Sequence, residues 1–170
     1  MYAANLAASQ FPPVTVFGLP LHPLVVHVVV VLLPLAAIGG ILMAFWVRFS
    51  KRFGPLVIIT AWAAFAGALA AAQTGQQLQI ALSINIGNHG TMGGLARWVS
   101  LGFAVIVSIL GYLDWRLGRP GKPKRRGTWE WFMSGLTVIA GLVSIYWIIL
   151  VGHSGAKIIW GPIGKLISGK

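Results

Sequence analysis

The chain has 170 residues, of which 57% are hydrophobic and only 9% are charged, and its mean hydropathy is +0.83. Soluble domains carry about 25% charged residues, so this composition indicates an integral membrane protein with one membrane domain. The absence of cysteine excludes disulfides, Cys-ligated metal centres and thiol catalysis. The net charge of +11 does not indicate a nucleic-acid partner, because the basic residues lie at the ends of apolar segments.

Four apolar segments are each long enough to cross a bilayer core, which takes about 20 helical residues. They are residues 23–47, 55–82, 91–114 and 131–152. The sequence therefore predicts an all-α integral membrane protein, a four-transmembrane-helix bundle over residues 23–152. Residues 1–22 form an N-terminal segment. Residues 153–170 form an apolar, lysine-interrupted tail that we expect along the membrane surface or against a partner.

The entry to the first span carries two histidines in the sequence "LHPLVVH". Proline is favoured at the first helical position, so Pro23 predicts a helix start with His22 just before it and His27 on the helix. If both were helical, a spacing of five residues would set them about 140° apart around the axis. The two imidazoles are therefore not expected to bind one centre together.

Basic residues set the expected orientation. Nine of the thirteen lysines and arginines lie in two connections, residues 48–52 and 116–126. Cytoplasmic connections are enriched in such residues, so we expect these two inside and both termini outside, in a bacterial plasma membrane. Asp114 and Glu130, the two acids of the chain, are expected to be surface partners of Arg116 and Arg126.

This topology gathers the four histidines at the outer face. Counting 1.5 Å per helical residue from the cytoplasmic edge places them in one band about 30 to 37 Å above it. The same band contains glutamines and one arginine. The candidate site residues are His22, His27, His89, His153, Gln73, Gln76 and Arg97.

A short internal echo suggests that the bundle consists of two halves. The second span ends with Gln73-Thr74-Gly75, and the fourth with His153-Ser154-Gly155. Odd-numbered spans begin with histidine, at His27 and His89, and even-numbered spans end with a hydroxyl–glycine pair. The pattern predicts two helical hairpins related by an axis along the membrane normal.

The segments "GLPLHPLVVH", "TGQ", "NHGTMGG" and "GHSGAKIIWG" resemble an uncharacterised bacterial family of four-span membrane proteins, a domain of unknown function. The family opens with L-H-P-L-x-x-H and closes with G-H-x-G followed by an aromatic residue. The resemblance covers residues 18–161 and implies that the four histidines are characteristic family positions. Where many relatives carry an acid after the glycine of the second span, this chain has Gln76.

Three interpretations of the histidines remain open. Haem b is one, because four-helix bundles can bind haem between histidines; His27 with His89 or His153 would be axial, and Arg97 and Lys157 would pair with the propionates. A copper, zinc or iron site at His27, His89 and His153 is another. The third is a cofactor-free hydrogen-bonded cap in an accessory subunit. Either an electron-transfer complex or other membrane subunits would supply the protein partners.

Overall fold

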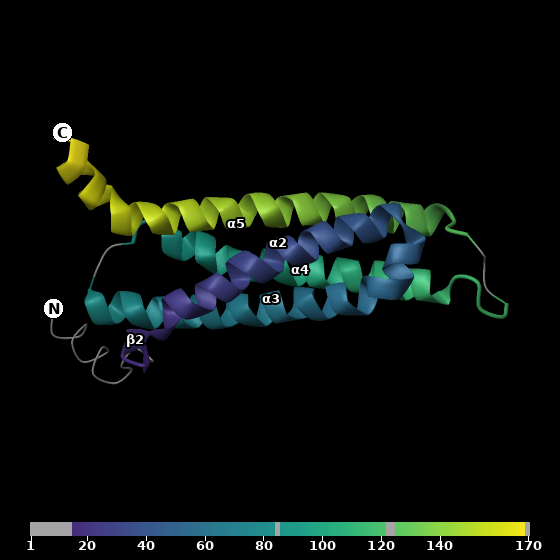
Figure 1. Ribbon diagram of the computed structural model, residues 1–170, viewed down its shortest axis with the longest axis horizontal. Helices are drawn as coiled ribbons and strands as arrows, with labels where there is room; N and C mark the ends of the chain where they lie inside the picture. Colours follow the sequence, from purple (N-terminus) through teal and green to yellow (C-terminus); the bar gives the residue numbers. More distant parts are fainter. Residues whose placement is uncertain (1–14, 84–85, 122–124, 169–170) are drawn as a thin grey trace.

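The computed structural model describes residues 15–83, 86–121 and 125–168, and these residues are almost entirely helical. Four helices run side by side (Figure 1). They are α2 (Leu21–Phe45), α3 (Val47–Leu82), α4 (His89–Arg116) and α5 (Thr128–Ser168). All four contain a segment long and apolar enough to cross a membrane. The predicted class, a four-helix membrane bundle, is confirmed.

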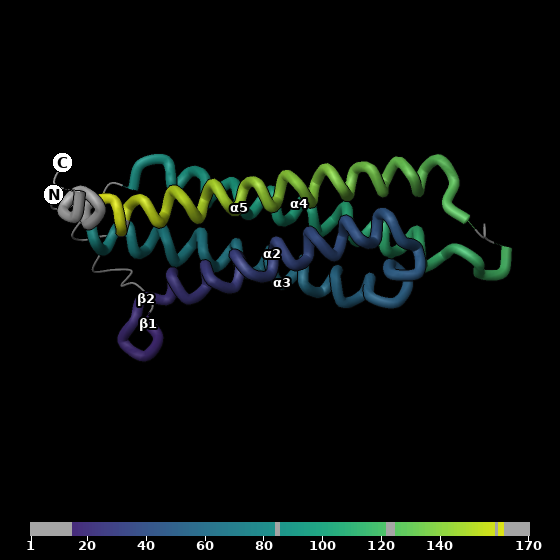
Figure 2. The backbone as a smooth tube through the Cα atoms, turned by 45° about the horizontal axis from the view of Figure 1, so that its top comes forward, coloured from purple at the N-terminus to yellow at the C-terminus, as the bar shows by residue number. Residues whose placement is uncertain are grey.

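The helices form two antiparallel hairpins, α2–α3 and α4–α5, that pack against each other. Each helix contacts two neighbours, and α2 also touches α4 across the bundle (Figure 2). The histidine end is where α2 and α4 begin, and the basic end is where α2 meets α3 and α4 leads to α5 (Figure 1).

A two-stranded hairpin precedes the first span. β1 (Thr15–Val16) pairs antiparallel with β2 (Leu19–Pro20). The two residues between the strands, Phe17 and Gly18, have φ values of 52° and 79°. Positive φ at both positions is the geometry of the tight turn that fits the twist of a β-hairpin, and glycine adopts it without strain. This hairpin was not predicted, because its two-residue strands are too short to show a pattern in the sequence.

The first helix begins earlier than predicted. Leu21 is its first residue, so His22 lies inside the helix and not before it. Proline remains compatible with this start, because Pro23 is in the first turn, where the backbone N–H groups have no intrahelical acceptor. The backbone of His22 is therefore helical, and this fixes the direction in which its ring points.

The predicted connection at residues 48–52 is helical. α3 begins at Val47, and Trp46 alone, with φ −128° and ψ 104°, separates it from α2. The charges in this segment mark the edge of the apolar region but do not end the helix. Pro55, the predicted start of the span, lies inside α3.

The fourth helix is longer than its predicted span. α5 continues beyond Gly152 to Ser168, so the tail extends the helix at the histidine end. Its apolar, membrane-compatible part covers Thr128–Ile158. Whether the remaining tail contacts a membrane surface or a partner stays a prediction.

Small residues bring the four helices close together. A Cβ on Gly39 would lie 2.7 Å from Cγ2 of Val57 on α3, and one on Gly40 would lie 2.9 Å from Cζ of Phe103 on α4. Close approach of backbones replaces the hydrophobic drive that lipid removes. Glycine at these two positions therefore allows α2 to pack closely against α3 and α4.

The buried positions repeat between the two hairpins. Residues 29, 33, 36, 37, 40 and 43 of α2 are buried, and so are the residues 67 positions later on α4. Residues 54, 57, 61, 64 and 68 of α3 are buried, and so are the residues 80 positions later on α5. The two hairpins therefore present corresponding faces to the core, as the short echo in the sequence predicts.

Candidate functional site

His22 connects the beginning of α2 to the far part of α3. Its Nδ1 lies 2.9 Å from the carbonyl oxygen of Ala71 and 3.4 Å from Oγ1 of Thr74. The ring edge lies against Gly75, where an added Cβ would come within 2.8 Å of Cε1 of His22. A larger residue at position 75 would displace the imidazole, so this contact needs glycine.

His89 makes the corresponding connection between α4 and α5. Its Nδ1 lies 2.8 Å from Oγ of Ser154, and that hydroxyl lies 2.8 Å from the carbonyl oxygen of Val151. A Cβ on Gly155 would lie 2.9 Å from Cε1 of His89. The partners of the two histidines are again 80 residues apart: Thr74 and Ser154, Gly75 and Gly155.

The hydroxyl–glycine pairs of α3 and α5 thus contact the histidines at the beginning of α2 and α4, but the histidine predicted for the first helix is wrong. His22, rather than His27, contacts Thr74 and Gly75. The ring of His27 is exposed, and its Nδ1 lies 2.5 Å from the carbonyl oxygen of Pro23, one turn earlier in the same helix. The five-residue spacing turns His27 away from the side that His22 uses.

The hydrogen bonds fix the same tautomer for both half-buried rings. The carbonyl of Ala71 can only accept, so Nδ1 of His22 carries the proton. The hydroxyl of Ser154 donates its one proton to Val151 and therefore accepts from Nδ1 of His89. In both rings Nε2 keeps its lone pair, and the residues that the structure describes supply it with no hydrogen-bond partner.

The other predicted site residues lie around this pair in different environments. His27, His153, Gln73 and Gln76 are exposed, so the rest of the chain does not cover them. Arg97 is partly buried: its guanidinium lies 5.5 Å from the ring centre of Trp98, and its Nε is buried without a partner among the described residues.

No group of three or more His, Asp or Glu side chains in the described part of the chain is placed to hold one metal ion. The copper, zinc or iron site predicted at His27, His89 and His153 stays a prediction. The structure places two half-buried imidazoles, those of His22 and His89, at the same end of the bundle.

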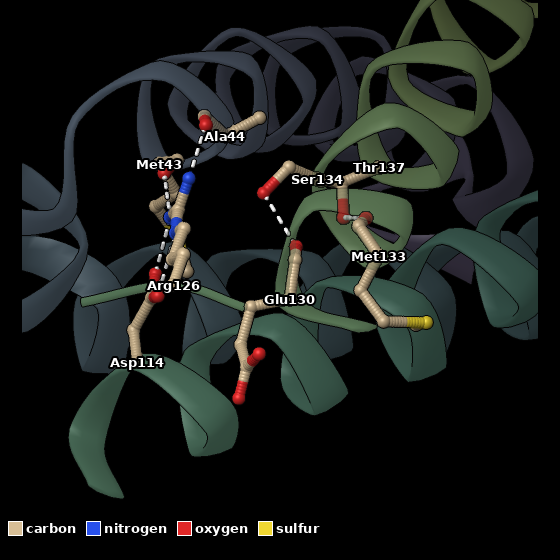
Figure 3. Close-up of polar contacts among 8 residues, drawn as sticks. All are labelled: Met43, Ala44, Asp114, Arg126, Glu130, Met133, Ser134 and Thr137. Atoms are coloured by element: carbon tan, nitrogen blue, oxygen red, sulfur yellow. Dashed lines mark hydrogen bonds and ion pairs between the residues drawn. The ribbon is translucent and has the colours of Figure 1, made fainter. Parts of the chain in front are cut away.

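A second polar centre lies at the basic end (Figure 3). Asp114, expected at the surface, is fully buried, and Arg126 binds it through two hydrogen bonds of 2.8 and 2.5 Å. The same guanidinium donates to the carbonyl oxygen of Met43 at 2.7 Å and to that of Ala44. Asp114 thus pairs with Arg126, and the expectation that it lies at the surface is wrong. An acid inside a segment otherwise apolar enough to span was the available signal.

Glu130 stays nearer the surface. Its carboxylate accepts the backbone N–H of Gly127 at 3.0 Å, as an acid in the first turn of a helix does. It therefore contributes to the start of α5 and not to the buried pair.

These features define a class: a multi-pass membrane protein with two parallel helical hairpins and an inward-facing histidine in each. A family described as "Predicted membrane protein (DUF2231)", a domain of unknown function, matches residues 18–162. The chain belongs to this family, which agrees with the resemblance seen in its histidine motifs. No curated protein and no solved structure matched the chain.

Proposed function

We propose that this protein is a haem b-binding membrane subunit of an electron-transfer complex, with His22 and His89 as axial ligands. The observation that supports the proposal is the shared tautomer of the two rings. In each ring Nδ1 donates a hydrogen bond to the neighbouring helix, so the lone pair of Nε2 is available to a ligand. A hydrogen bond from Nδ1 that orients the ring is the usual arrangement of a metal-ligating histidine.

The donor set fits haem better than a bare metal ion. Haem iron takes one or two ligands from the protein, whereas protein-bound copper or zinc usually takes three or more. His22 and His89 lie on α2 and α4, which face each other across the bundle. The unpaired buried Nε of Arg97 is a donor suited to a carboxylate such as a propionate.

Haem bound here would supply one-electron transfer. The chain's own residues would position the two imidazoles. Ala71 and Ser154 orient the rings, and Gly75 and Gly155 let them lie against the helices. The ring of His89 would be held from α5, and that of His22 from α3.

The exposed polar groups favour a partner subunit at the histidine end. Polar side chains near a membrane are costly unless they face protein or water. His27, Gln73, Gln76 and His153 are exposed at this end, where a second membrane subunit would give them partners. In this proposal the chain is an accessory component of a larger respiratory complex.

One observation favours a cofactor-free role instead. The two histidines already link helices, since each joins the two helices of its hairpin through a hydrogen bond and a close glycine contact. Such bonds stabilise helix association by about 1 kcal/mol each. In this alternative the pair is a hydrogen-bonded cap, and Nε2 of each ring contacts water.

The experiment is the absorption spectrum of the detergent-purified protein before and after dithionite reduction. We expect a Soret band that shifts on reduction and is lost in His22→Ala and in His89→Ala. His27→Ala and His153→Ala are matched controls that should keep it. His89→Met should keep bound haem but raise its reduction potential, as a methionine ligand does.

Three results would contradict the haem proposal. A colourless protein with copper, zinc or iron by mass spectrometry would indicate the metal-ion site. A colourless and metal-free protein would indicate that both histidines serve only to hydrogen-bond neighbouring helices. A Soret band that survives in both alanine variants would place any haem elsewhere.

A further inference from the structure

A hollow at the basic end lies where α4 ends. It is lined by Tyr112, Trp115, Arg116, Arg119 and Pro120, and its volume is about 520 Å³. The lining thus combines two cations with two amphipathic aromatic rings, and it contains no acid. The histidine site lies at the opposite end of the same helix and uses none of these residues.

Both arginines are stacked on the aromatic rings. The guanidinium carbon of Arg119 lies 3.2 Å from the ring centre of Trp115, and that of Arg116 lies 5.6 Å from the ring of Tyr112. A stacked guanidinium keeps its N–H edge free for acceptors such as phosphate oxygens. Neither side chain has a hydrogen-bond acceptor within the ranges that the structure describes.

The nearest acid does not neutralise these charges. Asp114 is buried and bound to Arg126. Lys51 adds a further positive charge close by, because its Nζ donates to the carbonyl oxygen of Leu117 at 2.7 Å. The hollow therefore has an uncompensated positive charge.

The aromatic rings place the hollow at the level of lipid headgroups. Tyr112 and Trp115 are 55% and 54% exposed on the last turns of a membrane-spanning helix. Tyrosine and tryptophan at such positions lie at the membrane–water interface. We propose that this hollow binds the phosphate headgroup of an anionic phospholipid through Arg116 and Arg119. Basic pockets at the ends of membrane helices recognise such headgroups.

The other hairpin provides an internal comparison. Phe45, Trp46, Val47, Arg48 and Phe49 line a hollow of about 420 Å³ where α2 ends. Phe45 occupies the place of Tyr112, 67 residues earlier, and the chain turns into α3 directly after it. This hollow has one cation in its lining, so a phosphate should prefer the hollow at α4.

The test is native mass spectrometry of the purified full-length protein titrated with phosphatidylglycerol or phosphatidylcholine. We expect wild-type protein to retain phosphatidylglycerol preferentially. Arg116→Gln combined with Arg119→Gln should lower its apparent affinity about tenfold or more, because each interfacial arginine contributes about 1 kcal/mol. Arg48→Gln combined with Arg52→Gln removes the same charge at the same end and should change the affinity little.

The outcomes distinguish specific binding in the hollow at α4 from non-specific attraction of anionic lipid to the basic end. Equal losses in the two double variants would overturn the proposal, and so would unchanged binding in the first. Displacement of the lipid by millimolar inorganic phosphate would indicate a soluble phosphate ligand instead. If the first double variant does not fold, Arg119→Gln alone is used. Arg119 lies beyond the end of α4, and its loss should weaken binding about fivefold.

Discussion

At the scale of single residues, glycine decides where the two imidazoles lie. Gly155→Ala would bring a methyl group to 2.9 Å from Cε1 of His89, so the ring must move. Gly152→Ala, one turn earlier on the same helix, meets no atom within 4 Å. We expect Gly155→Ala to destabilise the protein by about 1 to 3 kcal/mol. Gly152→Ala should be neutral or stabilise it by up to about 1 kcal/mol, because alanine is the better helix former.

Thermal unfolding in detergent, followed by circular dichroism, measures both variants. A lower midpoint for Gly155→Ala alone would confirm that the contact is tight. Equal midpoints for the two variants would mean that the imidazole of His89 moves aside without cost. If the protein binds haem, the same variant should also shift the Soret band, because the axial ring is displaced.

The sequence predicted which residues lie at the candidate site better than it predicted the directions in which their side chains point. Counting residues along the spans gathered the four histidines at one end, because distance along a helix is fixed at 1.5 Å per residue. Which of the two histidines of α2 faces inward depends on the rotation of this helix about its axis, which its packing against α3 and α5 sets. Because α2 begins two residues before the predicted start, His22 is helical and points to Ala71 and Thr74, while His27 lies five residues further along and is exposed.

At the scale of elements, each hairpin caps a helix of the other. Arg126 donates to the carbonyl oxygens of Met43 and Ala44, in the last turn of α2. These carbonyls lack helical partners because the backbone breaks at Trp46. In the opposite direction, Lys51 of the first hairpin donates to Leu117, at the end of α4. Cations are favourable at both places, because a helix C-terminus carries partial negative charge.

The buried ion pair that holds this joint should be sensitive to charge removal. Asp114→Asn leaves the guanidinium of Arg126 buried without its counter-ion, and breaking a buried pair on one side costs about 3 to 5 kcal/mol. Glu130→Gln is the matched control, because it removes the other acid at the same end while its amide oxygen can still accept from Gly127. We expect it to cost less than about 1 kcal/mol.

Unfolding of both variants in a detergent and denaturant series gives the comparison. A loss for Asp114→Asn no larger than that for Glu130→Gln would show that water or a backbone carbonyl replaces the carboxylate. Asp114→Leu combined with Arg126→Met removes both charges. It should recover part of the loss, since neither ion is then left buried alone.

The helix boundaries at the basic end were the least predictable part of the fold. Arg48, Lys51 and Arg52 were interpreted as a connection because charge marks the edge of the hydrocarbon layer. Charge does not end a helix, however, and α3 passes through these residues without interruption. The actual break is the extended backbone of Trp46, for which the sequence contains neither glycine nor proline as a signal.

At the scale of the whole molecule, the repeat explains why a short echo was informative. Corresponding core positions recur at a constant spacing in both hairpins, although small residues on one side meet larger ones on the other. Ala36 corresponds to Phe103, and Gly40 to Val107. Because the repeat preserves burial but not residue identity, it is not detected when the sequences of the two hairpins are compared. It became visible in the sequence only at Thr74-Gly75 and Ser154-Gly155, where the packing restricts the residue types.

The distribution of charge predicts the side of the membrane on which the histidine end lies. Of the thirteen lysines and arginines, nine belong to the two connected ends of the hairpins. Short basic connections are retained in the cytoplasm, so the histidine end should face outward.

Because α5 ends at the histidine end, reporters fused to the C-terminus test this orientation (Figure 1). Alkaline phosphatase fused after Lys170 should be active, and green fluorescent protein at the same place should be dark. Both reporters inserted near Pro120 are the control and should give the reverse. Fluorescence from the C-terminal fusion would show that the orientation is inverted. His22 and His89 would then lie at the cytoplasmic side.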